Sequence, residues 1–130
     1  MSLKIGFAAI ALSFAAASFA APPPNVAGVW TLVVDQQLET LDIVQGGPGL
    51  GPCPPIQGTI GIAPVRGFYC PDSGRLYFHH SNLHTDVTVR TFEGFVAQAA
   101  NGNPMQVAGK LTVVNTAFAP RGDYPFSGTK

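Results

Sequence analysis

Residues 86–113, with the sequence DVTVRTFEGFVAQAANGNPMQVAGKLTV, decide the fold of this chain. From Met105 to Val113 every second residue is apolar or glycine, and most of the residues between them are polar. This period of two is typical of a β-strand with one buried face. Residues 101–103, Asn-Gly-Asn, form a turn sequence that can join two strands directly. The stretch therefore predicts a long β-hairpin.

The first strand of this hairpin contains a change of phase. Val87 and Val89 share one face of an ideal strand, whereas the apolar positions from Phe92 onward lie on the other face. One extra residue in a strand shifts its side chains in this way. We therefore predict a β-bulge near Arg90 or Thr91.

Further strand candidates surround the hairpin, and no convincing amphipathic helix is present. They are short, rich in β-branched and aromatic residues, and separated by turns, with Pro64 as the expected end of the third: residues 28–34, 39–45, 56–63, 67–79 as a second hairpin, and 121–128. Seven or eight strands at this spacing predict an all-β protein. The expected architecture is an antiparallel up-and-down barrel over residues 28–130, with a β-sandwich as the alternative.

The N-terminus carries the pattern of an export signal. Lys4 provides a positive start, residues 5–17 are uncharged and mostly apolar, and Ser18 and Ala20 are the small residues that signal peptidase requires. We predict a signal peptide over residues 1–20. Its removal leaves residues 21–27 as a Pro-rich N-terminal arm, and the location is expected to be periplasmic or secreted.

The charge of the chain excludes one class of partner. Seven basic residues balance seven acidic ones, and removal of Lys4 leaves six against seven, a net charge near −1. A nucleic-acid-binding protein would need a basic patch, so no nucleic-acid partner is expected. The mature part also lacks a second apolar stretch long enough for a transmembrane helix.

Cys53 and Cys70 are the two cysteines of the chain. Cys53 lies in residues 46–55, which contain four glycines and four prolines and therefore form a loop. An isolated pair in an exported protein is expected to form a disulfide, worth about 3 kcal/mol for a loop of this length. The C-x-x-C spacing of a redox site is absent.

Three histidines form the best metal-binding candidate in the chain. His79, His80 and His84 lie within six residues, and three imidazoles can hold zinc or copper. The alternative is a strand end with ordinary surface histidines, since adjacent residues of a strand face opposite sides. The sequence contains no nucleophile elbow and no metalloprotease helix, so we expect neither an enzyme nor a bound cofactor.

Gly28-Val29-Trp30 is a G-x-W motif at the start of the first strand. It resembles the calycin group of small barrels, which includes lipocalins, avidins and bacterial inhibitors of secreted metalloproteases. The resemblance implies that Trp30 packs across one barrel end under an arginine from late in the chain, and Arg121 is the candidate. A biotin pocket of the avidin kind needs several tryptophans, and Trp30 is the only one here.

These features predict a non-enzymatic exported binding protein. Its partner would be a small apolar molecule held at a barrel mouth near Trp30. One alternative is an inhibitor of a secreted hydrolase that acts through residues 21–25 or a loop. A further alternative is a structural or assembly protein of the cell envelope. A barrel of about eight strands can also fill its interior with its own side chains, which would exclude an interior ligand.

Overall fold

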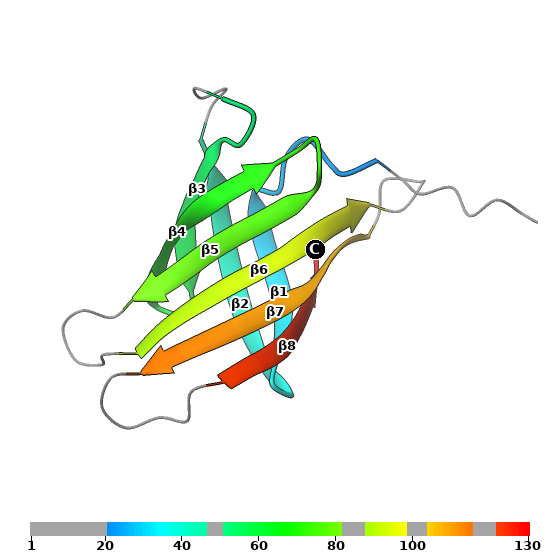
Figure 1. Ribbon diagram of the computed structural model, residues 1–130. Helices are drawn as coiled ribbons and strands as arrows, with labels where there is room; N and C mark the ends of the chain where they lie inside the picture. Colours follow the sequence, from blue (N-terminus) through cyan, green and yellow to red (C-terminus); the bar gives the residue numbers. More distant parts are fainter. Residues whose placement is uncertain (1–20, 47–50, 82–87, 99–103, 116–121) are drawn as a thin grey trace, which may run out of the picture.

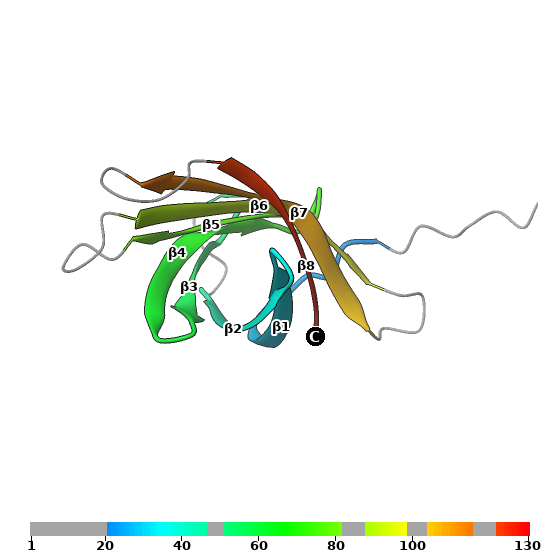
Figure 2. The ribbon, with the colours of Figure 1, turned by 90° about the horizontal axis from the view of Figure 1, so that it is seen from below.

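The computed structural model describes residues 21–46, 51–81, 88–98, 104–115 and 122–130. In these ranges eight strands form a closed antiparallel barrel, in which each strand pairs with the next and β8 returns to β1 (Figures 1 and 2). The strands are β1 (Gly28–Val34), β2 (Gln37–Gln45), β3 (Pro55–Ile60), β4 (Ala63–Cys70), β5 (Arg75–Ser81), β6 (Thr88–Gln98), β7 (Met105–Asn115) and β8 (Gly122–Thr129). The predicted barrel is confirmed, and the sandwich alternative is wrong. The predicted signal peptide lies outside the described residues.

The β6–β7 hairpin pairs without interruption from Thr88 opposite Asn115 to Gln98 opposite Met105. The predicted bulge is therefore wrong. The change of phase in the sequence has another cause, because Arg90 stands on the inner face together with Phe92, and its guanidinium lies 5.5 Å from the centre of the Phe92 ring. A charged residue at an inward position mimics a shift of register.

The third predicted strand also ends differently from the expectation. The chain turns at Gly61 and Ile62, and Pro64 lies inside β4, opposite Thr59 of β3. The β4–β5 pairing begins one residue later, at Val65. Pro64 has no backbone N–H group, and this costs no ladder hydrogen bond between β4 and β5.

The middle of the barrel is filled by aromatic and aliphatic side chains. Phe78 and Phe92 stack with ring centres 4.5 Å apart, and Phe92 meets the edge of Phe126 at 5.3 Å. Further buried residues from strands β1 to β7 complete this core: Leu32, Val34, Leu41, Ile43, Ile56, Ile60, Val65, Leu76, Val96, Val107 and Leu111. The described side chains at this level pack against one another as a hydrophobic core.

The N-terminal arm lies against one end of the barrel (Figure 1). We call this end the sealed end and define it by Pro23, Val26, Trp30 and Tyr69, all of which are buried. The Trp30 indole donates a hydrogen bond to the Val26 carbonyl at 2.8 Å, and the Tyr69 hydroxyl donates to the Pro23 carbonyl at 2.5 Å. The arm thus supplies the acceptors that two buried aromatic residues need.

Gln45 fixes the arm from the wall of the barrel. Its side-chain carbonyl accepts a hydrogen bond from the Val26 amide at 2.9 Å, and its amide group donates to the Pro24 carbonyl at 3.2 Å. A single side chain at the end of β2 therefore bonds to two residues of the arm, Pro24 and Val26.

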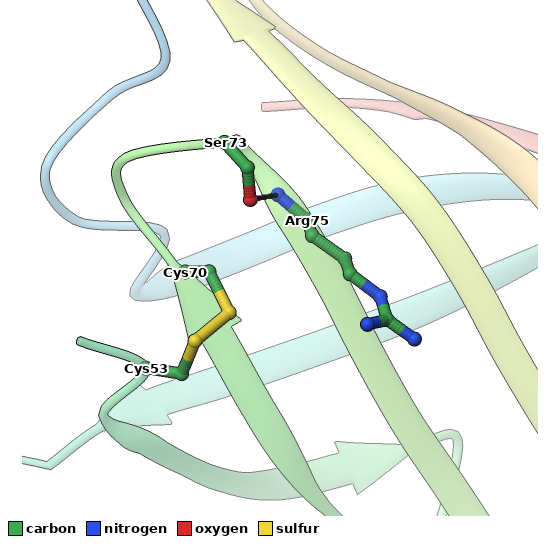
Figure 3. Close-up of a disulfide and its surroundings, with 4 residues drawn as sticks. All are labelled: Cys53, Cys70, Ser73 and Arg75. Atoms are coloured by element: carbon green, nitrogen blue, oxygen red, sulfur yellow. Dashed lines mark hydrogen bonds between the residues drawn. A yellow bond between two sulfur atoms is a disulfide. The ribbon is translucent and has the colours of Figure 1, made fainter. Parts of the chain in front are cut away.

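The predicted disulfide between Cys53 and Cys70 is confirmed (Figure 3). It ties the loop before β3 to the end of β4, next to the turn at residues 71–74, where the Ser73 hydroxyl accepts a hydrogen bond from the Arg75 amide. A disulfide is typical of an oxidising compartment and therefore suggests export. Within the described ranges, no helix has the length and apolar character needed to cross a membrane.

Candidate functional site

The opposite end of the barrel has a polar interior. Strand direction brings three inward-facing residues to this end: Glu39 near the start of β2, His80 near the end of β5, and Arg90 near the start of β6. We call it the polar end and define it by these three side chains. The sealed end and the polar end thus lie on either side of the packed aromatic core.

Glu39 and Arg90 form an ion pair across the inside of the barrel. Nη1 of Arg90 donates to Oε1 of Glu39 at 2.8 Å and to Oε2 at 3.1 Å. Strands β2 and β6 are separated by the same number of strands in both directions around the barrel, so the pair spans the interior. The side chains are 21% and 25% exposed for Arg90 and Glu39 respectively, which is too buried for an ordinary surface pair.

His80 lies next to Arg90 in the register of β5 and β6 and is only 9% exposed. Neither Nδ1 nor Nε2 has a hydrogen-bond partner among the residues that the structure describes. Burial lowers the pKa of His80, the positive charge of Arg90 lowers it further, and Glu39 partly opposes them. The ring is therefore neutral at pH 7 and presents one unpaired donor and one unpaired acceptor.

Less polar residues complete the wall around this group. Val65 is the neighbour of His80 on β4, and Val113 is the neighbour of Arg90 on β7. Gly122 follows on β8, where a Cβ atom would lie 3.2 Å from the hydroxyl oxygen of Tyr124. The missing side chain at Gly122 therefore makes room for the Tyr124 ring. The described polar end therefore combines an ion pair and an imidazole with apolar or neutral neighbours.

The three predicted metal-binding histidines are not brought together by the described residues. His80 faces inward, whereas the register sets the adjacent His79 on the outer face, opposite Arg66 and Thr91 and 6.4 Å from the Tyr77 ring. His84 lies outside the described residues. In the described part of the chain, no group of three His, Cys, Asp or Glu side chains could hold a metal ion.

The surroundings of Trp30 differ from those of an open barrel mouth. Its side chain is 0% exposed, and the arm covers it. Arg121, the expected partner of Trp30, lies outside the described residues. The basic residue that the structure does show beside the start of β1 is Lys130, whose ammonium group donates to the Ala27 carbonyl.

Sequence reasoning missed Glu39 and Arg90 as site residues. They are separated by 51 positions in the chain and meet only because the sheet closes into a barrel. One signal was available, because Arg90 stands in phase with the apolar positions that begin at Phe92. A charged residue in the apolar phase indicates either a bulge or a buried charge that needs a partner.

Comparison of this chain with protein-family models, with curated proteins and with solved structures finds no match.

Proposed function

We propose that this protein is a non-enzymatic, exported binding barrel that takes a small ligand at its polar end. The observation that carries the proposal is His80, which is nine-tenths buried and has no partner for either ring nitrogen among the described residues. An unpaired buried donor or acceptor costs about 1–3 kcal/mol. A bound group that pairs with His80 would recover part of this cost.

The geometry limits the size and position of such a ligand. The arm covers Trp30, so the polar end is a better candidate than the mouth near Trp30 that the sequence favoured. Phe78 and Phe92 fill the barrel below the polar end. The ligand would therefore be shallow, with its polar group at His80 and its apolar part against Val113 or Tyr124, both of which are partly buried.

Two further observations support the wider class of protein. The closed barrel with a G-x-W motif on its first strand is compatible with a calycin-like barrel, a group that includes small-molecule carriers. The disulfide and the N-terminal pattern of residues 1–20 support a periplasmic or secreted location.

The test is the intact mass of mature protein, beginning at Ala21 and purified from the periplasm. Native and denaturing spectra are compared for the wild type, His80→Leu and His79→Leu. We expect excess mass in the native wild type that is lost on denaturation, kept in His79→Leu and absent from His80→Leu. A bare native mass, or the same excess in all three proteins, would contradict the proposal.

A hydrolase inhibitor remains the second candidate function, and the sealed end favours it. The arm contacts the turn at residues 71–74, because a Cβ atom at Gly74 would lie 3.2 Å from Pro22, and the disulfide fixes the adjacent loop. Such a rigid, exposed surface lowers the entropy cost of binding a protein. The packed residues of the arm would have to leave Trp30 and Tyr69 before they could enter an enzyme cleft. We therefore propose that the arm stays docked and that the surface it forms contacts the hydrolase.

This candidate is tested by inhibition assays against secreted hydrolases. Pro24 is exposed, and only its carbonyl is bonded to Gln45, so Pro24→Glu changes the surface and leaves that contact in place. Deletion of residues 21–25 is less clean, because it also removes the acceptor of Tyr69. An inhibitor that uses this end should lose potency in Pro24→Glu and keep it in His80→Leu. Equal potency in both variants would exclude the sealed end.

A further inference from the structure

We infer that the polar end binds an uncharged hydrogen-bonding group, of which a carboxamide is the simplest example, in preference to a carboxylate, a phosphate or an ammonium group. This inference rests on the proposed binding function and adds the chemical class of the ligand. It is carried by the arrangement of Glu39, His80 and Arg90 inside the barrel.

The charges at the polar end already compensate each other. Both carboxylate oxygens of Glu39 accept hydrogen bonds from Arg90. An anionic ligand would compete with Glu39 for the guanidinium, and a cationic ligand would compete with Arg90 for the carboxylate. Either displacement leaves one partly buried charge without its partner, which is costly.

In the part of the chain that the structure describes, the side chains around the ion pair offer no further charge to a ligand. The register sets Leu32 beside Glu39 and Val113 beside Arg90, and the guanidinium lies over the Phe92 ring. These groups are apolar or neutral. A ligand charge that entered this end would therefore be desolvated and would find no counter-ion of its own among these described side chains.

A neutral group can bind without disturbing the ion pair. Among the described residues Arg90 donates only through Nη1, to Glu39, so the other N–H groups of the guanidinium could donate to a carbonyl oxygen. The neutral ring of His80 can accept from an N–H group or donate to an oxygen, according to its tautomer. A carboxamide carries both complements in one planar group.

The experiment compares three ligands of equal size: propionamide, propionate and propylammonium. Mature protein with ¹⁵N-labelled histidine is titrated with each of them, and the ring signals are followed by NMR. The chain has only three histidines, so His80→Leu and His79→Leu assign the signals. We expect propionamide to shift the His80 signals with saturation and to bind at least about tenfold more tightly than the two ions. The signals of His79, on the outer face, should not move.

Two variants of the ion pair give the sharper result. Glu39→Gln leaves Arg90 without its counter-charge, so this variant should prefer propionate. Arg90→Gln leaves Glu39 without its counter-charge, so this variant should prefer propylammonium. Unchanged His79 signals and an unchanged circular dichroism spectrum show that each variant is folded. The inference is overturned if the wild type prefers either ion, if propionamide moves no His80 signal up to its solubility limit, or if the folded variants keep the wild-type order of preference.

The outcome also separates this inference from the proposed function. Suppose that the native protein carries a ligand that His80→Leu loses, while the wild type prefers propionate. The binding function then stands, and the neutral class of ligand is wrong. A bare native mass together with unmoved His80 signals contradicts both.

Discussion

The two ends of this barrel treat their buried polar groups in opposite ways. At the sealed end, Trp30 and Tyr69 each donate to a carbonyl of the N-terminal arm. At the polar end, His80 is also buried, with 9% of its surface exposed, but has no partner among the described residues. Folded proteins pair nearly all of their buried polar atoms, so an unpaired one calls for an explanation. The difference indicates that the sealed end adds stability, and it is the basis of our proposal that the polar end gives up stability for binding.

The largest expected effect is at the sealed end. Trp30→Ala should lower the free energy of unfolding by about 3–5 kcal/mol, because it removes a fully buried indole and opens a cavity beneath the arm. Denaturant unfolding followed by circular dichroism measures this, since Trp30 is the only tryptophan and the variant has no tryptophan fluorescence. A loss below about 1 kcal/mol, the size of a typical surface change, would show that the arm does not seal this end.

The disulfide is the second support of the sealed end. Replacing both Cys53 and Cys70 with serine should lower the free energy of unfolding by about 3 kcal/mol, because the unfolded chain regains the entropy of a 17-residue loop. The same NMR signals of His80 should remain unchanged, because the bond lies at the other end of the barrel. A shift of the His80 signals would contradict the independence of the two ends.

The sequence predicted the barrel better than it predicted the site, and Arg90 shows why. Alternation over Met105–Val113 and the motif that includes Trp30 gave correct strands, since each depends on neighbouring residues within one strand. The Cys53–Cys70 pair was also predictable, because the chain has no other cysteines. The Glu39–Arg90 pair depends on closure of the whole sheet, which no local pattern encodes.

The histidines and the arm illustrate the same limit. Sequence spacing grouped His79 with His80, but alternation in β5 sets them on opposite faces of the wall. The Pro-rich composition of residues 21–27 indicated an arm but not its docking, which depends on acceptors for Tyr69 at a distance of 46 positions. The candidate site and the docking of the arm depend on contacts between segments far apart in the sequence, whereas the strands follow from local alternation.

A smaller effect distinguishes the two ends by pH. Tyr69→Phe should lower the free energy of unfolding by about 1 kcal/mol at neutral pH, because the Pro23 carbonyl loses its donor. Burial raises the pKa of Tyr69 from 10.0 to about 12. The phenol therefore stays neutral to a higher pH in the folded state than in the unfolded state. Its contribution to the free energy of unfolding is complete below pH 10 and declines between pH 10 and about 12. Alkaline unfolding curves should show this decline in the wild type and in Tyr77→Phe but not in Tyr69→Phe.

The smallest effect has the opposite sign and lies at the polar end. His80→Leu should leave the free energy of unfolding unchanged or raise it by up to about 1 kcal/mol at pH 7, because it removes a buried group without a partner in the described part of the chain. The lowered pKa of His80 means that the unfolded state binds the proton more readily. Stability from this residue is therefore complete above the unfolded value of 6.5 and is lost as the pH falls from there through the lower folded pKa.

Denaturant unfolding between pH 7 and pH 5 measures this loss, with His79→Leu as the matched control on the outer face of the same strand. The wild type and His79→Leu should lose stability with acid more steeply than His80→Leu. If His80→Leu instead destabilises the protein at pH 7 as Tyr69→Phe does, His80 is a satisfied part of the core. The contrast between the two ends and the proposed binding role would then fail together, because both depend on an imidazole that the described residues leave without a partner.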